Sequence, residues 1–160
     1  MRLQVLCVGR LKAGPERQLI ARYSERIAPV GRAVGLAPLD LREIDEGRAR
    51  RPDDRKIDEA LRIAALLPEG SALWALDESG ASLTSEEFAR DIGKLRDQGT
   101  PTLGFAIGGA DGLDESLRQR ANRTITFGAM TLPHQLIRVL LLEQIYRATT
   151  ILSGHPYHRG

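Results

Sequence analysis

The sequence predicts an α/β domain with a mostly parallel sheet that is covered by helices on both faces. Short apolar runs, which read as strands, alternate along the chain with segments whose apolar residues recur at helical spacing. Strands that alternate with helices in this way are typical of parallel sheets. At 160 residues the chain has the length of one ordinary domain, and no repeat, low-complexity tract or linker divides it. We therefore expect residues 1–160 to form a single domain.

The first half of the chain predicts two strands and two helices. Residues 3–8 are a short apolar run that ends at a glycine, which indicates a strand, and a stretch of helical spacing begins at Pro15. Residues 39–42 alternate between apolar and charged side chains and predict a second strand. The highly charged segment 43–55 is interpreted as a mobile loop, and residues 57–67 carry the apolar stripe of another helix.

The second half continues the same alternation. Residues 71–76 predict a buried strand. Thr84, with Glu87 three residues later, forms a capping-box pattern for a helix that runs to Leu95. The remaining predicted elements are a strand at 102–107, a helix at 114–120, a strand at 124–127 and a long helix at 136–152.

Composition and charge exclude several classes of protein. Hydrophobic residues make up 42% of the chain and charged residues 28%, unlike disordered or fibrous sequences. The net charge is only +2, but basic residues gather in the first third, which suits a polyanion and equally suits a plain solvated surface. The lone cysteine, Cys7, excludes an intrachain disulfide framework and fits a reducing compartment. Without a long apolar stretch, we expect a cytoplasmic protein that does not enter membranes.

Glycines cluster directly after the strand predicted at 102–107. The run Gly108-Gly109-Ala110-Asp111-Gly112 would let a backbone approach a bound molecule, although a plain tight turn explains it more simply. Its spacing matches neither the dinucleotide fingerprint nor a P-loop. Ligands bind open α/β sheets at the carboxyl ends of strands, and the predicted ends at 76–77, 107–108 and 127–128 could form one crevice.

Residues 127–134 are poor in charge and rich in small or apolar side chains. Such a stretch suits backbone recognition of an adenine in an apolar pocket, and a simple loop-to-helix connection would explain it too. Within it, His134 is interpreted as making a local hydrogen bond at a helix start rather than as a catalyst.

The C-terminal tail, residues 155–159, concentrates functional side chains where chains usually fray. Arg159 can grip phosphate, Tyr157 can stack on a base, and a histidine can move a proton near neutral pH. A metal pair from His155 and His158 lacks a third ligand nearby, and a remnant of cloning is a further explanation. From the residues alone, the sequence indicates a small α/β ligand-binding protein or enzyme.

Five motifs taken together resemble the RlmH (YbeA) family of SPOUT methyltransferases, almost end to end. They are Leu76-Asp77-Glu78 with Gly80, Ile107 to Leu113, Thr131 to Leu140, Glu143 to Ala148, and His155-Pro156-Tyr157-His158-Arg159. The resemblance implies a deep C-terminal trefoil knot, an exception to the rule against knotted chains. The knot would form a pocket for S-adenosylmethionine. Carried onto this sequence, the residues of that pocket are Leu76, Gly108, Phe127, Gly128, Ala129, Met130, Thr131 and Leu132.

The resemblance also implies a reaction and partners. Family members are homodimers that methylate N3 of a pseudouridine in large-subunit (23S) rRNA of the assembled ribosome, without a metal. His158 is hypothesised to accept the N3 proton, assisted by Tyr157 and Arg159, which together with His155 and Arg138 would also bind the substrate. The long helix would pack across the dimer, so that the tail could reach the partner's donor pocket.

Several alternatives stay open. The base could need no protein acceptor, in which case the tail only positions RNA. The same pocket would serve a SPOUT methyltransferase that acts on transfer RNA, and a non-catalytic ribosome-binding factor could retain the fold. A nicotinamide-binding protein is disfavoured because the dinucleotide fingerprint is missing.

Overall fold

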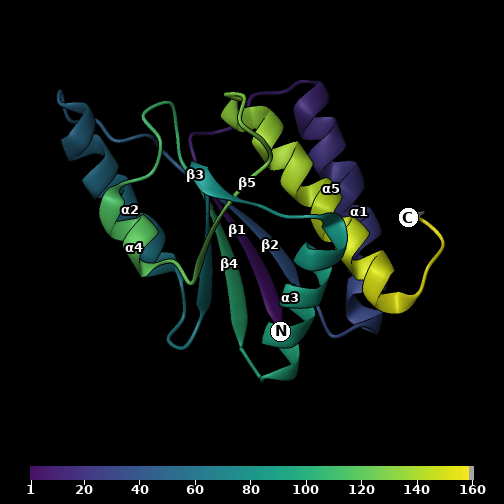
Figure 1. Ribbon diagram of the computed structural model, residues 1–160. Helices are drawn as coiled ribbons and strands as arrows, with labels where there is room; N and C mark the ends of the chain where they lie inside the picture. The colour runs from purple at the N-terminus through teal and green to yellow at the C-terminus, as the bar shows by residue number, and fades with distance from the viewer. Residues whose placement is uncertain (159–160) are drawn as a thin grey trace.

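Five parallel strands form one sheet in the computed structural model, which describes residues 1–158. Their order across the sheet is β2-β1-β4-β3-β5 (Figure 1). The strands are β1 (Arg2–Val8), β2 (Leu39–Ile44), β3 (Ala72–Ser82), β4 (Thr102–Ile107) and β5 (Arg123–Thr126). The helices are α1 (Pro15–Ala33), α2 (Pro52–Leu66), α3 (Ser85–Asp97), α4 (Glu115–Arg120) and α5 (His134–Ser153). The predicted α/β class and parallel sheet are therefore confirmed.

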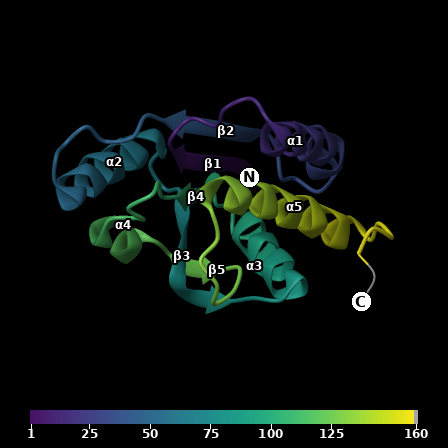
Figure 2. The same cartoon turned by 90° about the horizontal axis from the view of Figure 1, so that it is seen from above.

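Helices cover both faces of the sheet. Helices α1, α3 and α5 lie on one face, and α2 and α4 lie on the other (Figures 1 and 2). Strand β1 shows why its sequence is mostly apolar: Leu3, Val5 and Cys7 pack in the first core, while Leu6 and Val8 pack in the second. Gln4 is a buried polar exception in this strand. Successive side chains of a strand point to opposite faces, so a strand buried on both faces has no side that alternates with polar residues. Within residues 1–158, none of the helices is long and apolar enough to cross a membrane.

The prediction of the charged segment 43–55 as a mobile loop was wrong at both ends, while residues 45–51 between them belong to no helix or strand. Strand β2 continues to Ile44, and α2 begins at Pro52. Proline at the first helical position and two acidic residues in the first turn favour this start, although none of them adds to an apolar stripe. The link between the two elements is tied to α2, because the Gly47 amide donates to Glu59 Oε1 at 2.7 Å.

Strand β3 runs past its predicted end at Leu76 to Ser82. Its pairing with β5 shifts register between Leu76 and Ala81. Gly80 lies in this interval, and a Cβ placed on it would come within 2.5 Å of the carbonyl carbon of Ile125. The close approach of β5 therefore requires glycine at this position.

Because all five strands are parallel, their carboxyl ends lie along one edge of the sheet. In Figure 1 this edge is at the top, above the N-terminus of β1. The start of α5 meets the same edge, where Arg138 donates to the carbonyl oxygens of Val8 at 2.6 Å and Gly9 at 2.9 Å. Of the predicted ligand-binding positions, Gly108 and Phe127 directly follow the ends of β4 and β5, whereas Leu76 lies inside β3.

Candidate functional site

The glycine-rich turn after β4 is closed tightly by its own backbone. Gly108 is buried, and a Cβ placed on it would lie 2.5 Å from the carbonyl carbon of Gly112. The turn also packs against β1, because a Cβ on Gly109 would lie 3.0 Å from Cγ1 of Val8. A side chain larger than hydrogen does not fit at Gly108 without a shift of backbone. This geometry fits a tight turn, and it also brings bare backbone to the carboxyl edge.

Strand β3 carries an ionised aspartate near its middle, and this side chain is engaged with protein groups. Leu76 is 9% exposed, and Asp77 follows it. Asp77 accepts hydrogen bonds from the Ser79 amide at 3.0 Å and from Arg118 Nη1 at 3.1 Å. Burial would raise the pKa of Asp77, but these hydrogen bonds outweigh it and hold the pKa below its ordinary value. Asp77 therefore orders the part of β3 that follows Leu76.

The segment from Phe127 to Leu132 leaves the sheet and becomes open to solvent. It is fixed at its start, where Thr126 Oγ1 donates to the Gly128 carbonyl at 2.9 Å. Gly128 has a φ of 136°, a conformation that favours glycine. Further along, Met130 is 80% exposed. These residues follow the end of β5, as the predicted donor pocket requires.

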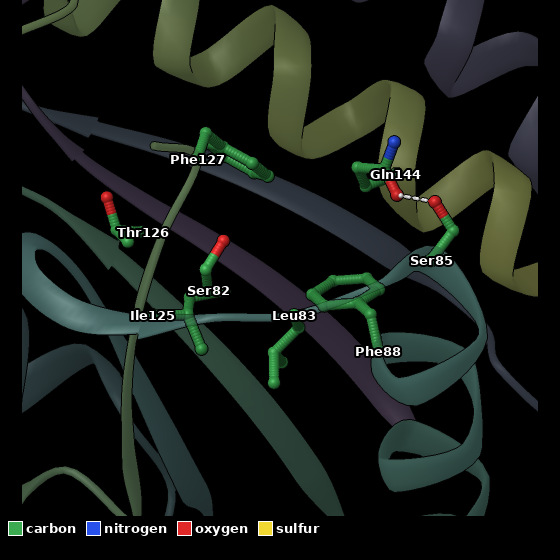
Figure 3. Close-up of a pocket in the computed structure, with 8 residues that line it drawn as sticks. All are labelled: Ser82, Leu83, Ser85, Phe88, Ile125, Thr126, Phe127 and Gln144. Carbon is green, nitrogen blue, oxygen red and sulfur yellow. Dashed lines mark hydrogen bonds between the residues drawn. The ribbon is translucent and has the colours of Figure 1, made fainter. Parts of the chain in front are cut away.

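A small cavity lies beside the start of this segment, between β3, β5, α3 and α5 (Figure 3). Its volume is about 150 Å³. The lining residues are Ser82, Leu83, Ser85, Phe88, Ile125, Thr126, Phe127 and Gln144. Of the predicted donor residues, Phe127 is on its wall. Sites for small molecules usually occupy roughly 300–1,000 Å³, so this cavity would hold only part of a molecule as large as S-adenosylmethionine.

The tail folds back onto α5 and α3 as far as His158. The Tyr157 hydroxyl donates to Glu143 Oε1 at 3.2 Å, and its ring meets Tyr146 edge-on with centroids 4.7 Å apart. His158 Nε2 lies 2.6 Å from Glu86 Oε1. Two of the predicted catalytic side chains are thus brought together on one surface. The third, Arg159, lies outside the described residues.

Glu143 connects the tail to α5. Besides Tyr157, its Oε1 accepts from Arg147 Nη2 at 2.6 Å and from Arg147 Nε at 3.1 Å. The Arg147 guanidinium lies 5.0 Å from the centre of the Tyr157 ring. Burial and the nearby charge of Glu143 raise the pKa of Tyr157, so its hydroxyl stays protonated and donates. Neither Glu143, which begins one of the motifs of the resemblance, nor Glu86 was predicted as a site residue. The i,i+4 spacing of Glu143 and Arg147 is the signal that could have found the first of them.

His155 is exposed, and its Nδ1 accepts a hydrogen bond from the Tyr157 amide at 3.2 Å. Across residues 1–158, no three histidine, cysteine, aspartate or glutamate side chains are grouped so that they could hold a metal ion. The metal-binding pair considered for His155 and His158 therefore finds no third ligand in this part of the chain.

Arg138, a predicted substrate contact, is 1% exposed. Its guanidinium binds the carbonyl oxygens at the end of β1, and Nη1 donates to Glu43 Oε1 at 2.9 Å. Arg138 thus ties α5 to β1 and β2, and its direct contact with a substrate stays a prediction. His134 lies one turn earlier and is half-buried. Burial, with a smaller effect of Arg138, lowers the pKa of His134, so the imidazole is neutral at pH 7.

Comparison with known proteins shows to which class of proteins this chain belongs. A family model described as "Predicted SPOUT methyltransferase" matches residues 1–158. The match covers the parallel sheet, the Gly108 turn, the segment from Phe127 to Leu132 and the start of the tail. The chain therefore belongs to the SPOUT methyltransferases.

Relatives with curated names define the family more closely. Three of them are called "Ribosomal RNA large subunit methyltransferase H". The protein of Xanthobacter autotrophicus is 55% identical over 160 residues and that of Rhodopseudomonas palustris 55% over 160, each covering 100% of both chains. The protein of Methylocella silvestris is 56% identical over 159 residues, 99% of both chains. Within its class, the chain belongs to the ribosomal RNA large subunit methyltransferase H family, and the resemblance seen in the sequence is confirmed.

Proposed function

We propose that this chain transfers a methyl group from S-adenosylmethionine to N3 of a pseudouridine in the large-subunit (23S) rRNA of assembled ribosomes. The observation that carries the proposal is 55% identity over the full 160 residues to a protein named for methylation of that RNA. An identity of this size leaves little room for a different active site. The proposed place of action is the cytoplasm, where ribosomes are assembled.

The proposed donor pocket combines Leu76, Gly108 and the segment from Phe127 to Leu132. Its support is that β3, β4 and β5 lead to one edge of the sheet, where switch points of α/β folds bind ligands. There is open space at the segment, because a Cβ placed on Gly128 would meet nothing within 4 Å. When bound there, S-adenosylmethionine supplies a methyl group already activated by its sulfonium.

In the proposed reaction, the protein must control the proton on N3 of the pseudouridine more than it must activate the methyl group. The N3–C bond forms as the S–C bond breaks, and the bonding electron pair stays with sulfur. An imide nitrogen is nucleophilic only once deprotonated, so N3 must give up its proton. His158 is the proposed acceptor, and Glu86, 2.6 Å from its Nε2, would stabilise the imidazolium that forms.

The proposed substrate contacts are distributed over the tail and α5. Tyr157 and Arg159 would bind the base and a phosphate, while His155 and Arg138 would make further contacts. Tyr157 is supported in this role by its fixed position against Tyr146, which leaves a ring held in a defined plane. No metal takes part in the proposed reaction.

We infer that the chain after β5 is threaded into a deep trefoil knot within a single domain of residues 1–160. Two observations support this threading. Strand β5 is at the outer edge of the sheet beyond β3, yet the helix that follows directly packs against α1 and α3 over the centre. The connecting segment from Phe127 to Pro133 must therefore cross the carboxyl edge, next to the turns that it would be threaded through.

The proposed assembly is a homodimer in which α5 contributes to the interface. Leu136 and Leu140, one turn apart on α5, are 41% and 38% exposed, and Leu19 on α1 is 38% exposed. Exposed leucines at such spacing are costly in a monomer and favour burial by a second chain. Within such a dimer, the tail of one chain would reach the donor pocket of its partner, so that two chains would build each active site.

The test is transfer of radiolabelled methyl from S-adenosylmethionine by the purified protein. Unmodified assembled ribosomes, fully modified ribosomes, free large subunits and bulk transfer RNA are offered in parallel. We expect label on unmodified assembled ribosomes alone, mapped to one pseudouridine.

Each other result selects an alternative. Label on transfer RNA would assign the chain to the transfer RNA methyltransferases. Donor binding without any label would mean a different substrate, and the absence of donor binding would favour a non-catalytic ribosome-binding factor.

A further inference from the structure

A second and larger cavity lies at the carboxyl end of β1, beside the start of α5. Its volume is about 330 Å³, which reaches the range of roughly 300–1,000 Å³ usual for sites that bind small molecules. The lining residues are Gly9, Arg10, Leu11, Lys12, Ala13, Glu16, Glu46, His134 and Gln135. We call this cavity the β1 pocket. It shares no lining residue with the proposed donor pocket or with the tail.

The walls of the β1 pocket offer hydrogen-bond donors and acceptors side by side. Lys12 is exposed and forms no ion pair with any residue from 1 to 158. His134 is neutral, so one of its ring nitrogens donates while the other accepts. The carboxylates of Glu16 and Glu46 accept, and the amide of Gln135 does both. This mixture suits a polar heterocycle better than a simple anion.

The wall at Gly9 has charges of both signs beside it. Oε1 of Glu46 would lie 3.3 Å from a Cβ placed on Gly9, and the Arg138 guanidinium behind Gly9 is paired with Glu43. Arg138 Nη2 lies 3.7 Å from the position that a Cβ on Gly9 would take, and Arg138 Nε has no hydrogen-bond partner in the described part of the chain. Helix α5 begins at His134 without a side-chain cap. The Leu136 amide already donates to the Pro133 carbonyl oxygen at 2.9 Å, so the helix start offers only the amides of His134 and Gln135, and its positive end lies at the pocket. The helix start and Lys12 favour a ligand that carries negative charge at one end.

We propose that the β1 pocket binds one uracil-type nucleotide of the RNA substrate, with its phosphate at Lys12 and its base edge against His134 and Gln135. This inference rests on the proposed function, which makes RNA the substrate. A uracil-type base presents two carbonyl acceptors around an imide N–H, which complements an amide donor beside an imidazole that can accept. Pro133 alone separates the donor segment, ending at Leu132, from His134. The bound nucleotide would thus lie beside the donor pocket.

The first experiment titrates the ¹⁵N-labelled full chain with uridine 5′-monophosphate, uridine and inorganic phosphate, followed by amide chemical shifts. We expect uridine 5′-monophosphate to shift the amides of Lys12, Ala13 and Gln135. Lys12→Ala should weaken its binding about fivefold, as the loss of one charged contact predicts, and Ala13→Trp should fill the pocket and abolish binding. Lys94→Ala removes the same charge from α3 and should bind like the wild type. If the nucleotide at millimolar concentration leaves these three amides unshifted, the proposal is wrong.

The second experiment measures single-turnover methylation of unmodified ribosomes by the same variants, together with their affinity for S-adenosylmethionine. We expect Lys12→Ala to raise the ribosome concentration at half-maximal rate about fivefold and to lower the salt slope by about one. The affinity for S-adenosylmethionine should not change, and a parallel loss of that affinity would assign the pocket to the donor instead. If the wild type methylates no ribosome while uridine 5′-monophosphate still shifts the pocket, the proposed function fails and the pocket stands.

Discussion

Tyr157 and His158 are held against the body of the protein by two carboxylates, Glu143 and Glu86. These contacts differ in their surroundings. Glu86 is 55% exposed and Glu143 only 16%. An exposed ion pair adds little stability because water and salt screen it. Little free energy is therefore lost when His158 leaves Glu86 for RNA or for a second chain. The contact of Tyr157 with Glu143, in contrast, anchors the tail.

Replacement of His158 tests its role as the proton acceptor. We expect His158→Ala to slow single-turnover methylation of saturating ribosomes by about 100-fold or more, the usual effect of losing a general base. Ribosome affinity, measured by co-sedimentation, should change little, and Lys94→Ala serves as the control. If affinity falls while the rate at saturation is kept, the base needs no protein acceptor and the tail only positions RNA.

Cys7 is a buried thiol whose chemistry reports on folding. Burial, only partly offset by Arg138, raises its pKa from 9.0 to about 12. The folded state therefore favours the thiol over the thiolate that reacts. Because the folded pKa lies above the unfolded one, this contribution to stability is complete below pH 9 and declines as the pH rises above it.

The expected result at pH 8 is that iodoacetamide spares Cys7 in the native protein and alkylates it in concentrated urea, as measured by intact mass. Native protein that reacts as fast as a free thiol would contradict the burial of this side chain.

At the scale of helices and strands, the sequence predicted the elements that their own residues determine. Strands β1 and β4 were found because nearly all of their positions are apolar, with Arg2, Gln4 and Thr102 as the exceptions, and α3 was found from the capping box of Thr84 and Glu87. The start of α2 was missed because its first turn is charged and carries no apolar stripe. The extension of β3 was missed because Gly80 is required only by the backbone of Ile125, which lies far along the chain.

Contacts between residues far apart in the sequence also limited what could be predicted of the candidate site. The turn at Gly108 and the segment from Phe127 could be placed from the resemblance and from the strand ends, since both follow predicted strands. The β1 pocket could not, because Gly9 and His134 meet only when α5 has crossed the sheet. The sequence predicted Arg138 as a substrate contact, but nothing local could reveal that its partners include Glu43.

The link that Arg138 makes between α5 and the first two strands should be a major source of stability. Arg138→Ala would remove the guanidinium from two carbonyl groups at the end of β1 and from the Glu43 carboxylate, which would keep only the Leu11 amide and the more distant Arg17. We expect the free energy of unfolding in urea to fall by about 3 kcal/mol or more. The exposed Arg120 on α4 provides a matched control, and Arg120→Ala should change it by less than about 0.5 kcal/mol. If Arg138→Ala changed the free energy of unfolding by a similarly small amount, the buried contacts of Arg138 would make no net contribution to stability.

At the scale of the whole molecule, the exposed leucines of α5 and α1 predict association. Leu140→Glu places a charge in the proposed interface and should convert the dimer to monomers at micromolar concentration, as measured by sedimentation equilibrium. Donor binding should survive, since the donor pocket lies within one chain, while methylation of ribosomes should be lost. A wild-type protein that sediments as a monomer under these conditions would overturn both the dimer and the shared active site.

The bonds from Arg138 to Val8 and Gly9 join positions 130 and 129 residues apart. Contacts between such distant positions form late, because a long loop of chain must close, and lose entropy, before the contacts can offset that loss. During synthesis, β1 leaves the ribosome first and waits for α5, which is made almost last. A nascent chain therefore has no finished binding edge until its own translation is nearly complete, so an enzyme for ribosomes becomes active only after release from one.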